Sequence, residues 1–376
     1  MLREMWDSVM AGKMFVSTSD GIPGGAGHFC SPTTTVAKKL PDRTISSDLR
    51  LIWDGGRAHL RCPKGDYWQC ETPSIVDLSA RYCSLRTSFP GIPILGTKRD
   101  IDSAPTRVRL HPDGATMFGS DFDVDKDRKS TMAFFYLVFP SGFSGSPGIF
   151  GRIMDAVQTY HRPFAPATPE RNGDLPYYDD VFVGDAMFLE ASIGHRQGQT
   201  VKVWDRAAEY FFGHEAVGKK KLDVEGRRGC RLILLGFEVN LEEDVIELPG
   251  PKILGAINLV SATEFNPGCL TLSVRALQEL RGSINHWSQT GYIWRFSTEP
   301  INQMIGHTDS SGVWVRCSDW DKWAALWSVI QFVRDLTLFA ELSRRSLVYV
   351  ASSLRPLPNV LVYGFRGTLH STVWAV

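Results

Sequence analysis

The stretch Leu175-Pro176-Tyr177-Tyr178-Asp179-Asp180-Val181-Phe182-Val183 decides which fold the sequence predicts. Its aromatic and β-branched residues favour two short strands. Asp179 and Asp180 suit a tight turn between these strands, because short carboxylates hydrogen-bond to the neighbouring backbone there. Two adjacent acids repel each other, and a cation shared with a third acid would make the arrangement reasonable. Taken by itself, the stretch fits an ordinary turn with solvated aspartates better.

Length and composition set the outer limits. A chain of 376 residues can bury a large core and is expected to divide into two or three lobes. Lys and Arg total 41, as do Asp and Glu, so net charge identifies no partner, and a nucleic-acid binder would need local basic patches. Seven cysteines without a CxxC spacing favour reduced thiols in the cytoplasm or nucleus over a zinc site or disulfide framework.

No segment of the sequence is typical of a membrane protein or an exported one. Residues 1–7 lack the apolar run of a signal peptide. The longest apolar stretch, residues 323–333, is too short to span a bilayer. We therefore expect no membrane partner.

The order of the expected elements indicates an α+β fold with a ferredoxin-like β-α-β-β-α-β unit. These elements are a strand over 97–102, a helix over 146–160, two strands within 175–184, a helix over 199–213 and a strand over 231–239. Ser146 is the expected N-cap of the first helix, and Pro147 its first residue. Gly142 and Gly145, just before this helix, would let the backbone approach another group closely.

The ferredoxin-like order places Asp100 on a strand beside the hairpin that carries Asp179 and Asp180. Three carboxylates then converge, although they are far apart in the sequence. Further strands are expected over 49–54, 106–110, 115–118, 131–139, 347–350 and 360–363, with helices beginning at Ser273 and near Trp323.

These residues resemble the reverse transcriptase (RNA-directed DNA polymerase) domain of retroelements, nearest to the enzymes of retrotransposons. Tyr177-Tyr178-Asp179-Asp180 matches the YxDD box, and residues 98–104 resemble the first aspartate motif. Residues 140–150 are similar to the template- and nucleotide-positioning motif. Residues 216–221 resemble the lysine motif, 234–237 the primer-grip turn and 50–54 the fingers motif. The similarity covers about residues 40–300, and six boxes occur in the family's order.

The resemblance implies a right-hand polymerase with a ferredoxin-like palm, fingers and a helical thumb and connection. The implied boundaries are 1–37 for a flexible leader, 38–95 for fingers, 96–105 for the palm strand with the first catalytic aspartate, 106–139 for fingers strands, 140–248 for the palm, 249–300 for the thumb, and 301–376 for the connection and an incomplete C-terminal segment like the start of ribonuclease H. Such a chain could be a fragment or decayed copy of a longer polyprotein, and it could reside in a retroelement particle.

The implied site uses two Mg²⁺ ions, with Mn²⁺ as an alternative, to stabilise the attacking and leaving oxygens of nucleotide addition. Asp100, Asp179 and Asp180 would be the catalytic metal ligands, since magnesium prefers hard oxygen donors. Lys221 would donate a proton to pyrophosphate, although Lys219, Lys220 or a solvated lysine run also fit. The implied nucleotide-binding residues are Arg43, Arg50, Ile101, Pro105, Ser141 and Gly142.

Two departures from the family's pattern keep other functions open. Pro105 stands where the family usually has an aromatic ring that excludes the 2′-hydroxyl, so weak sugar discrimination is expected. Residues 362–366 lack the aspartate that begins a ribonuclease H strand. The leading hypothesis is a polymerase that uses an RNA or DNA template with a primer and deoxynucleoside triphosphates. The alternatives are a catalytically inactive nucleic-acid-binding module of the same fold and a ferredoxin-like single-strand binder, which would need aromatic residues such as Tyr177 and Phe182 on its sheet.

Overall fold

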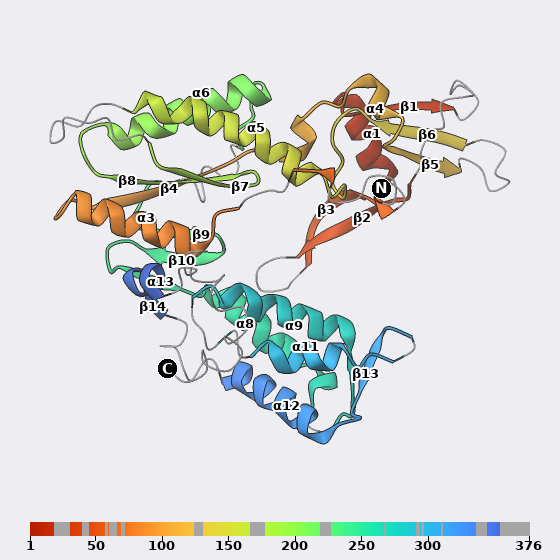
Figure 1. The fold of residues 1–376 in the computed structure, drawn as a ribbon. Helices are drawn as coiled ribbons and strands as arrows, with labels where there is room; N and C mark the ends of the chain where they lie inside the picture. Colours follow the sequence, from red (N-terminus) through yellow and green to blue (C-terminus); the bar gives the residue numbers. More distant parts are fainter. Residues whose placement is uncertain are drawn as a thin grey trace. The chain divides into compact units, whose positions relative to one another are not determined.

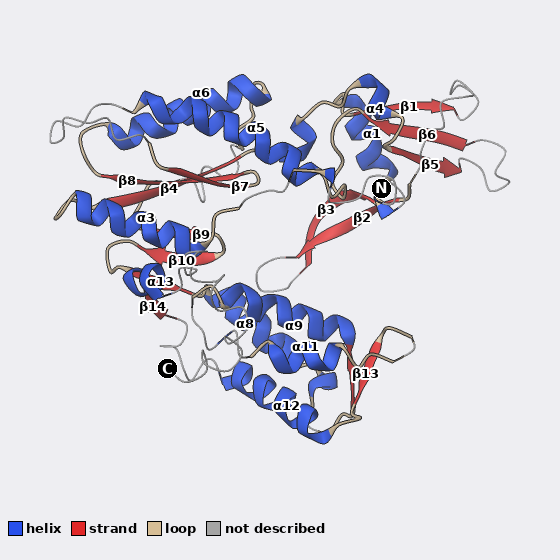
Figure 2. Cartoon of the chain, viewed as in Figure 1, coloured by secondary structure: helices blue, strands red, loops and turns tan. Residues whose placement is uncertain are grey.

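A computed structural model describes most of the chain and divides it into two compact units. The first unit comprises Met1–Pro73, Ser88–Glu243 and Pro249–Gly255, and the second comprises Ser74–Thr87, Asp244–Leu248 and Ala256–Val376. Helices and sheets are mixed in both, as the predicted α+β class requires (Figure 2). The described residues are 1–18, 31–39, 45–56, 59, 66–68, 72–123, 131–165, 177–218, 227–266, 268–290, 294, 297–309, 311–335 and 344–353.

The central sheet of the first unit is antiparallel, with the strand order β4-β8-β7. Its strands are β4 (Ile94–Asp100), β7 (Asp179–Phe182) and β8 (Asp185–Ala191). Two helices, α5 (Ser146–His161) and α6 (Arg196–Phe212), pack side by side over one face of this sheet (Figure 1). The predicted order β-α-β-β-α is therefore confirmed. Isolated bridges at Ile101–Val217 and Gly96–Gly229 occupy the outer edge of β4, beyond which the predicted last strand would lie.

Side chains of the central sheet alternate between two faces, which we call the helix face and the cavity face. The helix face packs against α5 and α6, and its core includes Ile101, Phe188 and Trp204. Arg99 also points to this face, because its Nε donates to Asp205 of α6 at 3.0 Å. Neighbouring strand residues point in opposite directions, so Asp100 and its β8 partner Asp185 lie on the cavity face.

Besides the central sheet, the first unit contains several smaller elements and an aromatic core. That core includes Trp53, Phe118, Phe134 and Phe143. The elements are α1 (Leu2–Met10), α4 (Pro112–Ala115), the sheet β1-β6-β5 formed by Met14–Thr18, Thr131–Tyr136 and Gly119–Asp123, the hairpin of β2 (Thr33–Lys39) and β3 (Ile45–Trp53), and the hairpin of β9 (Arg231–Leu234) and β10 (Phe237–Asn240).

The second unit is mainly helical. Ser273 caps α9 as predicted, because its hydroxyl accepts a hydrogen bond from the Ala276 amide at 3.1 Å. The unit contains α3 (Ile75–Ser88, of which Ser88 falls in the first unit), α9 (Val274–Trp287), α11 (Glu299–Ile305), α12 (Trp320–Arg334), α13 (Leu347–Ser353), and the strand pairs β11–β14 (Val245–Glu247 with Arg344–Ser346) and β12–β13 (Thr271–Ser273 with Trp314–Arg316). The helix α8 (Gly250–Val260) runs from the first unit into the second.

Three local predictions are wrong. Gly145, not Ser146, is the N-cap of α5, because the Ser146 hydroxyl donates to the Pro140 carbonyl instead. Residues 106–110 and 115–118 form no named strand, since a 3-10 helix over Ala104–Arg107 and α4 occupy much of that stretch. Residues 347–350 begin the helix α13 rather than a strand, and the strand expected over 360–363 lies outside the described residues.

Among the described helices, none is both long and apolar enough to cross a bilayer.

Candidate nucleotide and metal site

The hairpin turn of the central sheet falls at Val183–Gly184, not at Asp179–Asp180. Asp179 and Asp180 are the first residues of β7, and the strand runs on to Phe182, which pairs with Asp185. The predicted turn is therefore wrong. Val181 and Phe182 continue the strand beyond the two aspartates, and the two-residue connection comes where a glycine first appears.

Asp179 is buried on the helix face, where fixed protein groups bind its carboxylate. It is fully inaccessible to solvent. Its Oδ2 lies 3.2 Å from Nδ1 of His161, and its Oδ1 accepts a hydrogen bond from Nε of Arg162 at 2.9 Å. His161 Nε2 in turn lies 3.0 Å from the Thr200 carbonyl. Both carboxylate oxygens thus have partners within the protein.

Asp179 and Asp180 do not meet Asp100. Asp179 pairs with Phe188, which pairs with Thr97, so it lies three residues, or about 10 Å, along the sheet from Asp100 and on the opposite face. Asp180 shares the cavity face, but its neighbours across the sheet are Met187 and then Lys98, and β8 separates it from β4. The predicted trio of metal ligands is therefore not assembled.

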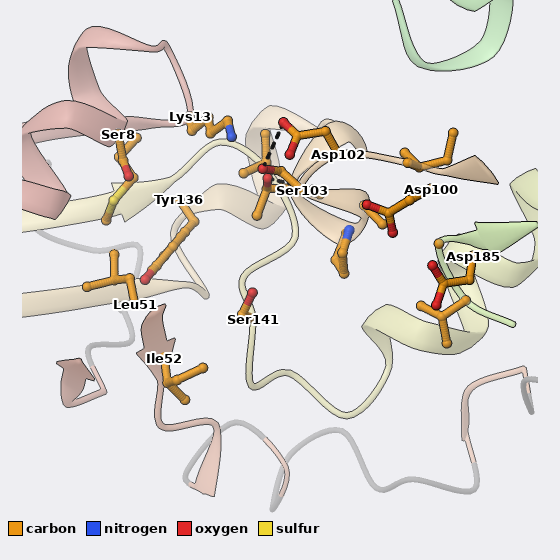
Figure 3. A pocket seen from close by; sticks show the side chains of 18 of the residues that line it. Ser8, Lys13, Leu51, Ile52, Asp100, Asp102, Ser103, Tyr136, Ser141 and Asp185 are labelled. Atoms are coloured by element: carbon orange, nitrogen blue, oxygen red, sulfur yellow. Dashed lines mark hydrogen bonds between the residues drawn. The ribbon is translucent and has the colours of Figure 1, made fainter. Parts of the chain in front are cut away.

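Asp185 occupies the position opposite Asp100 that the sequence analysis gave to Asp179. The two are direct partners across β4 and β8, which places their Cβ atoms about 4.5–5.5 Å apart. Both line a cavity of about 730 Å³, and Figure 3 shows both carboxylates projecting into it. Within the described residues, Oδ1 of Asp185 is buried and accepts no hydrogen bond. These two carboxylates form the candidate site.

Lys98 provides positive charge beside this pair. Its Nζ lies 3.4 Å from Oδ1 of Asp185. Asp102, by contrast, has left the strand: its amide donates to the Ala216 carbonyl, and its carboxylate lies 3.6 Å from the guanidinium of Arg107. The strand predicted over 97–102 therefore ends two residues early, because β4 ends at Asp100.

The turn beside Asp185 is strained and crowded. Val183 has a φ of 54°, a value that β-branched residues rarely adopt and that costs about 1–3 kcal/mol. Gly184 follows it, and a Cβ added there would lie 2.9 Å from Cβ of Ala104. The turn therefore accepts only a minimal residue directly before Asp185, and no side chain at position 184 can join the carboxylate pair without a shift of the backbone.

Other walls of the cavity bear two groups with shifted pKa values. Burial raises the pKa of Tyr136 to about 12, so its phenol stays protonated. Burial, with the charge of Arg107 adding to it, lowers the pKa of Lys13. Both shifts arise because the cavity walls exclude much of the water.

The residues predicted to contact the nucleotide have different outcomes. Pro105 and Ser141 line the cavity. Gly142 has a φ of 111°, and an added Cβ would lie 2.1 Å from the Trp53 carbonyl, so the close approach that this glycine predicted is to β3. Ile101 borders the cavity, but its side chain is 2% exposed and packs in the core of the helix face.

Three predicted cationic residues cannot be placed. Arg43 and Lys221 lie outside the described residues, and Arg50 belongs to β3 but its side chain is not described. Gly218, the last described residue before the lysine run, donates its amide proton to the Asp100 carbonyl at 2.9 Å. The described backbone thus brings the start of the run to β4.

Sequence reasoning missed Asp185 and Lys98. The available signal was Phe182-Val183-Gly184-Asp185, which has an aromatic residue first and an aspartate last, as a YxDD box does, with a glycine in the third position. Tyr177–Asp180 matched the box better by letter and concealed this tetrapeptide. In the described part of the chain, no group of three or more His, Cys, Asp or Glu side chains could hold a metal ion.

Comparison with known proteins supports the fold alone. No protein-family model matches the chain, and no curated protein matches it. Among similar solved structures, the foamy viral protease-reverse transcriptase in complex with double-stranded DNA has a TM-score of 0.52 and 12% identity over 87% of this chain and 46% of that chain. The same viral protein in complex with an RNA/DNA hybrid has a TM-score of 0.54 and 13% identity over 88% and 36%. This chain has a reverse-transcriptase-like fold and spans less than half of those proteins.

Proposed function

We propose that the chain catalyses template-directed nucleotidyl transfer, as an RNA-directed DNA polymerase of the retroelement type, at the cavity that Asp100 and Asp185 line. The observation that carries this proposal is the pairing of these two carboxylates on adjacent strands at the wall of a 730 Å³ cavity, in a fold similar to that of a viral reverse transcriptase. The solved neighbours are bound to double-stranded DNA and to an RNA/DNA hybrid, which supports a template–primer duplex as the partner.

The carboxylate pair fits Mg²⁺, with Mn²⁺ as its substitute. Magnesium typically takes one or two protein carboxylates and completes its octahedron with water and substrate phosphates. Asp100 and Asp185 would hold it, and the buried Oδ1 of Asp185 is a suitable donor. When bound, such an ion stabilises the charge that develops on the attacking and leaving oxygens. The predicted third aspartate is not at this site, so a second ion would depend on substrate oxygens.

The rest of the cavity would position the nucleotide. Pro105 and Ser141 lie on the cavity wall, and the backbone of Ser141 is fixed by a hydrogen bond from the Trp53 amide to its carbonyl at 2.9 Å. Arg43, Arg50 and Lys221 remain the proposed phosphate-binding and proton-donating residues. The finer assignment to fingers, palm and thumb rests on the same resemblance and is part of the proposal.

A second candidate function is nucleic-acid binding without catalysis. Two observations favour it: Lys98 already neutralises Asp185, and Gly184 supplies no carboxylate next to it. A polymerase-like module with this site would keep the template–primer surface but bind metal weakly.

Primer extension separates the two candidates. On a primed RNA template with Mg²⁺ or Mn²⁺, Asp100→Asn and Asp185→Asn should each lower the extension rate by at least about a hundredfold, since the loss of outer-sphere partners alone costs ten- to a hundredfold. Asp180→Asn is the matched control and should retain the wild-type rate. Wild-type activity in Asp185→Asn would refute the assignment. Absence of extension by the wild-type chain, with template–primer binding retained, would establish the second candidate.

A further inference from the structure

The geometry of β4 places Lys98 beside the cavity carboxylates. Lys98 and Asp100 are two residues apart on one strand, so both lie on the cavity face, whereas Arg99 between them binds Asp205 on the helix face. The direct β8 partner of Lys98 is Met187, two residues from Asp185. Lys98 and Asp185 are therefore diagonal neighbours, within reach of a long side chain.

The contact between Lys98 and Asp185 is sheltered from solvent. The lysine side chain is 14% exposed and the aspartate side chain 34% exposed, with 3.4 Å between Nζ and Oδ1. Salt screens such a partly buried pair much less than a pair on the open surface. The lysine ammonium is a compact point charge with three hydrogen-bond donors.

We propose that Lys98 is a built-in counter-ion of Asp185 that weakens the binding of divalent cations at the Asp100–Asp185 pair. The inference rests on the proposed function, which gives the pair its role in metal binding. A divalent ion at this pair would lie within a few ångströms of the lysine ammonium, and like charges at that distance repel strongly in a sheltered site. To bind, the ion must displace Nζ from Asp185 or share the carboxylate with it.

The same contact sets the charge that an incoming phosphate meets. Lys98 offsets part of the negative charge that Asp185 brings to the cavity wall. The site thus repels a phosphate less than a bare carboxylate pair does, even without a metal ion. In this scheme Lys98 influences cation binding indirectly, because it acts through its contact with the Asp185 carboxylate.

The experiment measures Mn²⁺ binding to the full chain by electron paramagnetic resonance, from the loss of the free-ion signal during a titration. Lys98→Met removes the charge and keeps the length of the stem, so it should tighten Mn²⁺ binding by about tenfold or more. Lys98→Arg keeps the charge and should stay within about twofold of the wild type. Lys13→Met, which removes a lysine from the same cavity near Asp102, is the matched control and should also stay within about twofold.

Two results would overturn the inference. The first is that Lys98→Met binds Mn²⁺ no more tightly than the wild type. The second is that the tighter binding of Lys98→Met persists when Asp185→Asn is added to it, which would place the ion elsewhere. A thermal melt checks the fold of each variant, and Lys98→Gln replaces Lys98→Met if the latter is unfolded. Tighter Mn²⁺ binding without primer extension would support the counter-ion and refute the polymerase, whereas extension without tighter binding would refute only the counter-ion.

Discussion

Asp179 and Asp185 belong to the same hairpin and open its two strands, yet their surroundings are opposite. Asp179 has no exposed surface and is bound by His161 and Arg162 on the helix face. Asp185 keeps a third of its side chain exposed, borders a cavity and contacts only Lys98 among the described ionic partners. The comparison teaches that two acids of one hairpin differ because they lie on opposite faces of the sheet, one packed against the helices and one at the cavity wall.

The largest expected effect concerns the stability that each acid contributes. Asp179→Ala leaves His161 and Arg162 without their buried anion and should lower the free energy of unfolding by about 3–5 kcal/mol. Asp185→Ala removes a partly exposed partner of Lys98 and should change it by about 1 kcal/mol or less. Urea unfolding followed by tryptophan fluorescence measures both. Equal losses in the two variants would contradict the division of the sheet into a structural and a functional face.

A smaller effect tests the crowding beside Asp185. Gly184→Ala places a Cβ 2.9 Å from Cβ of Ala104 and should cost about 1–3 kcal/mol as the turn shifts. Gly198 of α6 is the matched control, because nothing lies within 4 Å of its added Cβ. Gly198→Ala should raise stability by about 0.5–1 kcal/mol, since alanine is the better helix former. The same unfolding titration applies, and a tolerated Gly184→Ala would show that the turn has room.

The strain at Val183 gives a third, still smaller effect. Val183→Gly should stabilise the chain by about 1 kcal/mol, because glycine adopts a φ of 54° without penalty. Val181→Gly, in the strand just before, should instead destabilise it: both valines pack against the core of the helix face, but only Val183 has a positive φ whose relief offsets the lost packing. Thermal melting of both variants measures these two changes in stability. Destabilisation by Val183→Gly would mean that the valine side chain contributes more than its backbone strain costs.

The smallest effect is a change in how stability depends on pH. Burial raises the pKa of Glu190 on the helix face above its ordinary value of 4.5, although Arg196 opposes this. The folded state therefore holds the proton of Glu190 more tightly than the unfolded chain does. The contribution of Glu190 to the free energy of unfolding decreases as pH rises from about 4.5 through its raised pKa. Across that pH range the free energy of unfolding of the wild type should decrease relative to that of Glu190→Gln, because glutamine does not titrate. Unfolding curves at a series of pH values measure this, and a shift toward the wild type would contradict it.

The order of elements was predictable, because it follows from periodicity that both helices and strands show clearly. Phe150 and Met154 of α5 and Trp204 of α6 recur at helical spacing and are buried in the core of the helix face, and α6 ends at Phe212, one residue before the predicted end at 213. Phe211 of α6 is an exception, because it is apolar and yet 37% exposed. Local patterns therefore suffice where side chains repeat over several turns.

The site was only half predictable. The resemblance to the first aspartate motif led to Asp100, which lines the cavity, and its role as a metal ligand stays a prediction. Asp185 was missed because the register of a hairpin depends on where its turn falls. Asp179 and Asp180 resembled a turn by composition, but they begin a strand. Lys98 could not be predicted at all, since its contact with Asp185 exists only once β4 and β8 are paired.

The two-residue connection between β7 and β8 has a consequence for how this chain can change in length. Because side chains alternate with a period of two, slipping the pairing of β8 by one residue would exchange its two faces. Asp185 would then turn toward the hydrophobic helices, and Phe188 and Glu190 toward the cavity. Insertions at this position are therefore expected to be tolerated only when a bulge absorbs the extra residue, and a library of loop lengths should recover functional variants that preserve the register.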